Sequence, residues 1–505
     1  MRSRAAGSFA VLACVVSSFW RLGTHPALFW DEGWTLAAAR NWVELGWVGQ
    51  LLRGVPQSLG LSAEVTVVAP VALSFRLLGI GPWQGRLPGV LLMGATLWLL
   101  FHLTRRLYDT AAAWWALAVA ILVAPQADFQ PLIMGRQAFG EIPMLCYLLA
   151  GYACFLRTVE RPLDRARDAA WTVAAIVFWA LGLVVKLQGG PFFILSLLFP
   201  VALSLLIHRR ALALRFGIAL VSALVLSQLI PVGEALVLEG RMQPRVLVPG
   251  LLQVTALVMV PSVRLLTLAW SVEYAIPVTW GLAYAARTSL AHLRSDEGSA
   301  GRELIKLALM TFAASWLAWA TFLSVGFPRY LFPPLLIGSM ALGVLLRDGL
   351  QRIRANATSG TMRVSGLVGT SVMAALLFTS VPATVNRLGS ILFDSRPSAP
   401  THVAEFLNTS TPSDALIETY ESELFFLLDR RYHYPPDAVH VELNRRTFLH
   451  QDVPIPYDPL AADPDYLVVG RMSQMWKLYD AVTTSGAFRR VKRFEGYDVY
   501  ERVRK

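Results

Sequence analysis

Long apolar runs constrain the fold of this chain more than any other feature of its sequence. A helix needs about 20 mostly apolar residues to cross a bilayer, and we find about eleven runs of that kind. Hydrophobic residues make up 55% of the 505 residues and charged residues only 16%, whereas soluble domains carry about 25% charged residues. Because a single soluble core stops growing beyond about 250–300 residues, the apolar surplus must face lipid. The sequence predicts a polytopic α-helical membrane protein and argues against a disordered chain, a secreted disulfide scaffold or a simple soluble enzyme.

The predicted spans fill most of the first 385 residues. A further apolar run at 67–80 is short for a span and contains Arg76, so we place it as an interfacial or re-entrant helix. Trp20 and Arg21 suit an interface anchor at the end of the first span better than a signal-peptide cleavage site. The eleven spans are expected at about 5–21, 87–103, 112–128, 141–156, 170–186, 190–207, 211–230, 264–286, 304–324, 330–346 and 364–384.

Basic residues predict the orientation in the membrane. With the run at 67–80 kept outside, most arginines fall on one side, which the positive-inside rule makes cytoplasmic. The N-terminus is then cytoplasmic, and the loops 21–86 and 128–141 and the tail 386–505 lie outside the cytoplasmic (inner) membrane. The formal net charge of +11 becomes an orientation signal, and no nucleic acid is needed to explain it. The basic residues assigned to the cytoplasmic side are Arg2, Arg4, Arg105, Arg106, Arg157, Arg161, Arg165, Arg167, Arg209, Arg210, Arg215, Arg287, Arg294, Arg302, Lys306, Arg347, Arg352, Arg354 and Arg363.

The tail differs in composition from the rest of the chain. It is polar, and its strand patterns alternate with helix patterns, which indicates a small α/β domain. A segment of this length can form its own core. We therefore predict a membrane domain over 1–385 and an extracytoplasmic α/β domain over 386–505. Strands are expected at 415–420, 466–470, 488–494 and 496–503, and helices at 402–407, 422–428 and 474–482.

Three carboxylates in the two outer loops are candidates for chemistry. Asp31 and Glu32 lie in the loop 21–86, and Glu141 begins a span after the loop 128–141. Each could simply cap a helix or complement its dipole, but ionisable groups at membrane depth are costly and tend to be functional. A carboxylate at the membrane surface can take a proton or bind a metal. Carboxylates in both outer loops are better explained by one shared site.

Basic residues at outer ends run against the positive-inside trend. Arg136 precedes Glu141, Lys186 lies in a break between two spans, and Arg329-Tyr330 precede another span. Snorkelling explains each one singly. Together with the carboxylates, such cations suit a phosphate-bearing lipid substrate, because they neutralise the phosphate as it leaves.

The sequence offers little support for a metal or a nucleotide. Its eight histidines show no metal-ligand spacing, and it has no Walker A or G-x-G-x-x-G loop. Asp31 and Glu32 could hold a divalent cation, although two adjacent acids make a poor cage.

The order of these motifs resembles glycosyltransferase family 39 and its relatives. These include the protein O-mannosyltransferases and the aminoarabinose transferases that modify lipid A, and they have the GT-C fold. The resemblance covers roughly residues 20–345 and implies the GT-C fold for the predicted membrane domain. It rests on Asp31-Glu32, Arg86-Leu87-Pro88, Arg105-Arg106-Leu107-Tyr108, Arg136 with Glu141, Lys186 with its glycines, and Arg329-Tyr330-Leu331-Phe332-Pro333.

The resemblance also implies an activity and residue roles. The enzyme would be an inverting transferase that uses a polyprenyl-phosphate sugar donor, with Asp31 as the catalytic base and Glu141 as the second catalytic acid. Lys186 and Arg329 would bind the donor phosphate, and Glu32, Arg136 and Tyr330 complete the candidate donor- or substrate-binding set. Two positions depart from the family pattern: Glu141 stands where aspartate is common, and Ala69-Pro70 replaces a Pro-Pro pair.

The expected partners are the lipid-linked donor, membrane lipids and an acceptor lipid, glycan or protein. A transporter or flippase of a lipid-linked sugar is the alternative. Transporters usually show internal repeats and sites near the midplane, whereas the candidate charges here lie at outer ends and the halves are dissimilar. A receptor or assembly protein whose tail binds a partner would leave the loop carboxylates unexplained.

Overall fold

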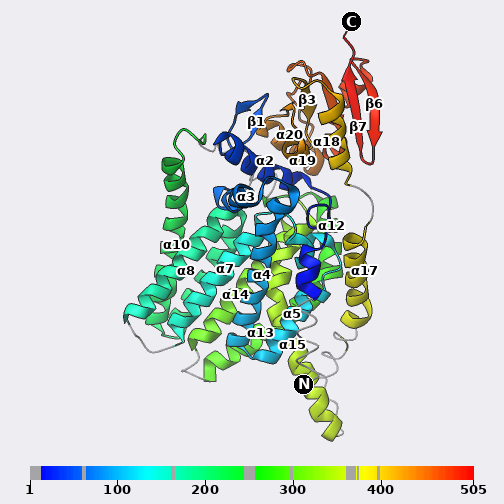
Figure 1. Ribbon diagram of the computed structural model, residues 1–505. Coiled ribbons are helices and arrows are strands. Elements are labelled where there is room, and N and C mark those ends of the chain that lie inside the picture. Colours follow the sequence, from blue (N-terminus) through cyan, green and yellow to red (C-terminus); the bar gives the residue numbers. More distant parts are fainter. Residues whose placement is uncertain are drawn as a thin grey trace.

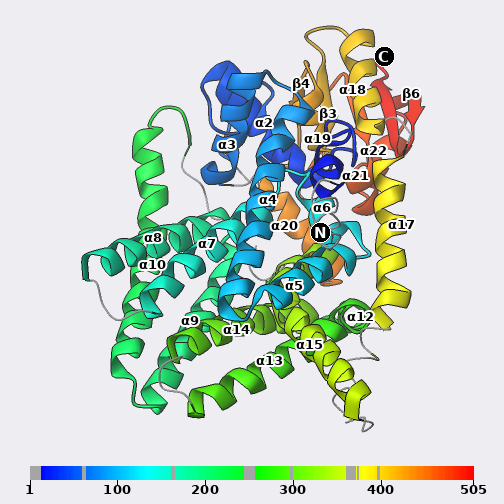
Figure 2. The ribbon, with the colours of Figure 1, turned by 60° about the horizontal axis from the view of Figure 1, so that its bottom comes forward.

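A computed structural model describes residues 13–59, 64–160, 165–243, 256–295, 300–359, 371, 375–394 and 398–504. A bundle of long helices forms one part of the molecule, and a mixed α/β region packs on one end of it (Figure 1). Figure 2 shows that α17 (Val381–Leu392) runs along the edge of the bundle toward α18 (Ala399–Ser410), the first helix of the α/β region.

Seven helical segments in the described part of the chain are long and apolar enough to cross a membrane. Each coincides with a predicted span, so the multi-pass character of the chain is confirmed. The helices that contain them are α4 (Pro82–Leu107), α7 (Glu141–Val159), α8 (Arg165–Val185), α9 (Gly190–Leu206), α10 (Arg210–Val237), α14 (Ala300–Phe322) and α15 (Phe332–Ser359).

The other predicted spans give shorter or interrupted helices, so a total of eleven stays a prediction. The run at 112–128 forms only α5 (Thr110–Leu122), and short turns follow it. The run at 264–286 is split by a π-helical turn into α12 and α13. The predicted spans 5–21 and 364–384 lie partly outside the described residues. The remaining elements of this region are η1 (Ala127–Phe129), α6 (Pro131–Met134), η2 (Leu187–Gly189), α12 (Pro261–Trp270), η3 (Ser271–Ala275), α13 (Ile276–Ser295), η4 (Pro328–Leu331) and η5 (Leu376–Ser380).

Small residues let the long helices approach one another closely. A Cβ atom added at Gly281 would lie 2.6 Å from the backbone of Leu342, and one added at Gly343 would lie 2.6 Å from the backbone nitrogen of Ala116. Lipid is as apolar as leucine, so membrane helices associate through this kind of packing rather than through the hydrophobic effect.

Two helices of the first loop lie across the end of the bundle, beneath the α/β region (Figure 1). They are α2 (Trp30–Leu45) and α3 (Val65–Leu78), and the short hairpin β1 (Leu51–Leu52) and β2 (Val55–Pro56) connects them. The apolar run at 67–80 therefore forms a helix, as expected, and its depth in the membrane stays a prediction.

The α/β region is built on a five-stranded sheet in the order β4-β3-β5-β7-β6. β3 pairs in parallel with β4 and β5, whereas β7 pairs antiparallel with β5 and β6. The strands are β3 (Leu416–Thr419), β4 (Arg431–His433), β5 (Tyr466–Val469), β6 (Phe488–Phe494) and β7 (Tyr497–Arg502). The helices are α18, α19 (Glu423–Leu427), α20 (Asp437–Phe448), α21 (Arg471–Met475) and α22 (Asp480–Thr484).

The four predicted strands and the first two predicted helices of the tail are confirmed. β4 and α20 were not predicted, because β4 has only three residues and α20 has little apolar periodicity. The single helix expected at 474–482 is wrong. Lys477 has a φ of 52°, in the left-handed region that a right-handed helix cannot include, and the segment divides into α21 and α22.

One hydrophobic core joins the first loop to the α/β region. Trp34 of α2 packs edge-on against Phe425 at a ring distance of 5.1 Å, and Phe75 of α3 stacks on Phe426 at 5.7 Å. The same cluster of buried side chains continues into β3, β5 and β7. The first loop thus packs with a region that follows it by more than 300 residues, on the end of the bundle where the site lies.

Candidate functional site

Four charged side chains predicted from separate segments lie together in one ionic chain. Arg329 donates to the carboxylate of Asp31, and Lys186 donates to the carboxylate of Glu141. Arg329 Nε lies 3.7 Å from Glu141 Oε1 and links the two pairs. The residues come from α2, η4, α7 and the turn between α8 and η2, so the tertiary fold brings four of the predicted site residues together.

The charges in this chain alternate and are graded in exposure. Glu141 is buried, with a side chain only 4% exposed, whereas the side chains of Asp31, Lys186 and Arg329 are 29%, 22% and 19% exposed. A buried carboxylate is tolerated when cations pair with it, and here two do so. Glu141 is the buried member of the chain, and the side chains of the other three residues are partly exposed.

The position of Asp31 follows from its neighbours on α2. Successive side chains of a helix point about 100° apart, so Trp30, Asp31 and Glu32 face three directions. Trp30 lies against the α/β region and Glu32 against Arg86 of α4. Asp31 lies between these two contacts and reaches Arg329.

Glu32 does not belong to the ionic chain. Its two carboxylate oxygens accept from Arg86 Nε and from a terminal nitrogen of Arg86, both at 2.7 Å, and both side chains are fully buried. This bidentate pair fastens α2 to α4. The Glu32 carboxylate thus faces Arg86, while Asp31 faces Arg329, and a divalent cation at Asp31 and Glu32 stays a prediction. Among the described residues, no group of three His, Cys, Asp or Glu side chains suited to a metal is found.

Arg136 is also separate from the ionic chain. Its fully buried guanidinium donates to the backbone carbonyls of His25 at 2.9 Å and Ser17 at 2.7 Å, and to that of Trp20. These bonds occupy its three nitrogens and tie the start of the first loop to the bundle. The expected role of Arg136 in binding substrate has no support in this geometry.

Tyr330 lies beside the site as part of its wall. Its ring packs on Trp319 at 5.0 Å and on Phe327 at 5.7 Å. Its backbone carbonyl accepts from the indole nitrogen of Trp316 at 2.9 Å. These contacts fix the short turn η4 and thereby the direction of Arg329.

Sequence reasoning missed three contributors to the site region. Arg86 was noted only as part of a motif, although a basic residue at the start of a span is a signal for a buried carboxylate partner. Asp128 lies on η1, which packs against η4, and the charges of Arg329, Arg387 and Arg471 act on its carboxylate. The residues of the α/β region that surround Trp30 lie between 390 and 446 positions away, so no local pattern could have linked them to it.

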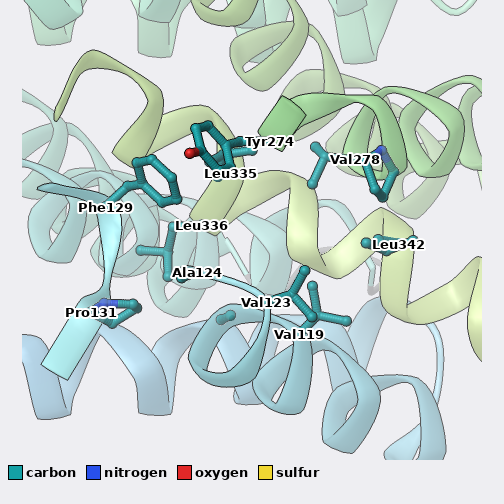
Figure 3. Close-up of a pocket in the computed structure, with 12 residues that line it drawn as sticks. Val119, Val123, Ala124, Phe129, Pro131, Tyr274, Val278, Leu335, Leu336 and Leu342 are labelled. Atoms are coloured by element: carbon teal, nitrogen blue, oxygen red, sulfur yellow. The ribbon is translucent and has the colours of Figure 1, made fainter. Parts of the chain in front are cut away.

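Two apolar spaces in the bundle are distinct from this site. A small pocket of about 20 Å³ beside η1 has room for about one water molecule and is lined mainly by apolar side chains, with Phe129 next to Tyr274 (Figure 3). A larger groove of about 590 Å³ lies between α9, α12, α13 and α14. Its wall includes Leu268, Ile276, Met310 and Phe322. Exposed apolar side chains on this groove suit contact with lipid chains.

The chain is similar to known membrane glycosyltransferases. Residues 67–233 match the sequence model of the family described as dolichyl-phosphate-mannose-protein mannosyltransferase. Over 99% of this chain and 98% of the other, the structure is similar to ArnT from Cupriavidus metallidurans bound to undecaprenyl phosphate, with a TM-score of 0.64 and 16% identity.

Archaeal structures have the same architecture. The structure is similar to the apo oligosaccharyltransferase of Archaeoglobus fulgidus (TM-score 0.56, 13% identity, 94% of this chain and 70% of the other). It is also similar to AglB of that organism in complex with an inhibitory peptide and a dolichol-phosphate (TM-score 0.54, 12% identity, 98% and 74%). Comparison with curated protein sequences gave no match. The family resemblance drawn from the sequence is confirmed: this is a multi-pass protein with the GT-C fold of membrane glycosyltransferases, and its residues 67–233 carry the pattern of the dolichyl-phosphate-mannose-protein mannosyltransferase family.

Proposed function

We propose that the protein is an inverting glycosyltransferase that moves a sugar from a polyprenyl-phosphate donor to a hydroxyl of a lipid, glycan or protein. The reaction takes place at the outer face of the cytoplasmic membrane. One observation carries this proposal: Asp31, Arg329, Glu141 and Lys186 converge from four separate elements into one accessible ionic chain.

The cations of this chain suit the phosphate of the donor. While Arg329 and Lys186 pair with Asp31 and Glu141, the net charge of these four groups is zero. An entering phosphate competes with Asp31 for Arg329, because guanidinium binds phosphate and carboxylate oxygens alike. Donor binding thereby frees Asp31 at the moment when it is needed. The bound lipid phosphates named for ArnT and AglB support this class of donor.

Asp31 is the base in the proposed reaction. It accepts the proton of the acceptor hydroxyl as that oxygen attacks the anomeric carbon from the face opposite the phosphate. The bond between the acceptor oxygen and the anomeric carbon forms while the bond between the anomeric carbon and the phosphate oxygen breaks. The electron pair of the broken bond leaves with the phosphate. Arg329 and Lys186 stabilise the charge that develops there. A single displacement inverts the anomeric configuration, and Glu141 keeps both cations in place.

The first test replaces the base. Asp31→Asn in purified, lipid-reconstituted protein is expected to lower transfer from a radiolabelled polyprenyl-phosphate sugar by about 10²- to 10⁴-fold, the usual contribution of a general base. Glu44→Gln is the matched control, since Glu44 is a carboxylate of the same helix whose only ion pair within the described part of the chain is with Arg40, at 3.0 Å. Full activity of the Asp31 variant would refute the assignment.

The same preparation distinguishes an enzyme from a transporter. An enzyme releases free polyprenyl phosphate and forms a new glycoside, whereas a flippase moves the donor across the vesicle without cleaving it. Mass spectrometry of glycolipids, glycans and glycoproteins in cells with and without the gene then identifies the acceptor and the sugar.

A further inference from the structure

We propose that the C-terminal α/β region, residues 399–504, sets the position of Asp31 by holding Trp30, so that Trp30 is a positioning residue for the transfer reaction. This inference rests on the proposed role of Asp31 as the base. It gives the C-terminal region a part in the chemistry, although none of its side chains belongs to the ionic chain described above.

Two hydrogen bonds join the backbone and side chain of Trp30 to the α/β region. The indole nitrogen donates to the carbonyl of Tyr420 at 2.6 Å, and Ser422 Oγ donates to the carbonyl of Trp30 itself. Tyr420 and Ser422 lie one and three residues after the end of β3. The peptide that connects Trp30 to Asp31 is thus bonded to the sheet region, and a shift of that region would shift Asp31.

Aromatic rings enclose the indole of Trp30 on several sides. His440 stacks on it with ring centroids 5.6 Å apart and an angle of 15° between the planes. Tyr420 and Trp476 meet it edge-on at 5.5 and 6.1 Å. Burial lowers the pKa of His440 to about 4, so the stacked imidazole is neutral near pH 7. Trp30 is only 6% exposed.

The backbone of α2 approaches the α/β region too closely to slide. A Cβ atom at Gly33 would overlap the backbone of Ser422 and Glu423. On the other side, the buried Glu32–Arg86 pair holds the helix to α4. Asp31 is therefore located by two contacts of its immediate neighbours, one to the bundle and one to the C-terminal region.

This arrangement predicts an effect on turnover rather than on donor binding. A displacement of about 1 Å at a reacting group can cost about 100-fold in rate, whereas Lys186 and Glu141 lie on other elements. If the contacts between α2 and the C-terminal region were purely structural, substitutions at any of them, including those far from Asp31, would change the stability of the protein instead.

The experiment compares two kinds of contact between the same two parts. Trp30→Phe removes the indole donor and keeps a ring, and Ser422→Ala removes the second bond without altering any ring. Arg40→Gln is the control. Arg40 also joins α2 to the α/β region, since it donates to the carbonyls of Phe426 and Leu428 at 2.9 and 3.1 Å, but it lies about 13 Å from Asp31 along α2. kcat, the donor KM and the Tm are measured for each full-length variant in lipid.

We expect Trp30→Phe and Ser422→Ala to lower kcat at least tenfold, with a donor KM within about threefold, at an assay temperature well below the Tm of every variant. Each also lowers the Tm, because it removes a buried hydrogen bond. Arg40→Gln should lower the Tm and keep kcat. Trp30→Phe combined with Ser422→Ala should lower kcat by less than the product of the single effects, because both bonds hold one peptide.

The positioning role is overturned if Trp30→Phe and Ser422→Ala keep full kcat, or if Arg40→Gln, with a comparable loss of Tm, loses as much kcat as they do. Asp31→Asn is assayed in parallel. If it is inactive while the Trp30 and Ser422 variants keep full kcat, only the positioning role fails. If it keeps full activity, the proposed function of Asp31 itself fails, and the positioning role fails with it.

Discussion

At the scale of single residues, the site depends on one guanidinium that serves two carboxylates. Arg329 donates to Asp31 and also lies 3.7 Å from Glu141 through Nε. The planar fork of arginine can reach both groups at once, whereas the ammonium of lysine is a single point of charge on a flexible stem. Arg329 is therefore the residue through which the outer and the buried carboxylate are coupled.

Replacement of this arginine by lysine tests the coupling. Arg329→Lys keeps the positive charge but is expected to lower kcat/KM for the donor by about 10- to 100-fold, because the lysine cannot reach both carboxylates and the phosphate. Steady-state transfer rates measure the effect. Arg347→Lys is a matched control, since Arg347 lies near the middle of α15, away from the site, and pairs with Asp109 and Asp348. Equal losses in both variants would argue against a specific role for Arg329.

At the scale of elements, α2 is the part of the first loop on which the site depends. It begins with Trp30-Asp31-Glu32, and its glycine at position 33 admits the backbone of the α/β region. The helix would be more stable with alanine at this position if propensity alone decided. The close approach to Ser422 and Glu423 explains why glycine is needed here.

Gly33→Ala is expected to push α2 away from the α/β region and to lower both the Tm and the transfer rate. Gly94→Ala is the control, because Gly94 lies inside α4 and a Cβ atom there would meet nothing within 4 Å. That change should be neutral or should stabilise the protein by up to about 1 kcal/mol. The Tm and the transfer rate of both variants are measured. If Gly33→Ala changes neither quantity, α2 and the α/β region are not in tight contact.

At the scale of the whole molecule, the α/β region contains a carboxyl group whose charge depends on pH. Burial and the nearby Glu421 raise the pKa of Glu423 to about 8, although Tyr497 donates to it at 2.5 Å. In the unfolded chain its pKa is about 4.3. Between these two values the folded protein holds a proton that the unfolded chain has lost, so stability falls as pH rises toward 8. His440, whose pKa burial lowers to about 4, makes stability rise with pH instead, but only below about pH 6.5.

The Tm is therefore expected to fall between pH 6.5 and 8, by an amount that corresponds to about 2 kcal/mol, since each pH unit contributes at most about 1.4 kcal/mol. Glu423→Gln should abolish this part of the pH dependence. Glu405→Gln, at an exposed position of α18, should retain it. A parental Tm that rises over this interval would contradict the assignment of Glu423.

The orientation of the whole molecule is a separate prediction. A reporter fused after residue 386 is expected to be extracytoplasmic, because the basic residues then collect on the cytoplasmic side. Alkaline phosphatase and a fluorescent protein, which are active on opposite sides of the membrane, give the readout. A cytoplasmic signal at this position would reverse the orientation and move the proposed reaction to the other face.

Much of the architecture could be predicted from sequence because its causes are local. Seven predicted spans coincide with long apolar helices, since a run of about 20 apolar residues has few stable structures in lipid other than a helix. The strands β3, β5, β6 and β7 were found from residue pattern and turns. The three-residue β4 and the break at Lys477 were not found, because their conformation depends on neighbours in the sheet region rather than on periodicity.

The sequence by itself determined that this chain lies in a membrane and where most of its helices run. It also singled out four charged residues at the ends of predicted spans. Hydrophobicity and scarce charge can be read from short segments, which is why these features were predictable. Only the tertiary structure decided which charges meet. It joined Asp31 to Arg329 across 298 positions, and it assigned Glu32 to Arg86 and Arg136 to backbone carbonyls. It also placed the α/β region behind Trp30. Pairing of this kind depends on which faces of distant helices come together, and no local pattern encodes that contact.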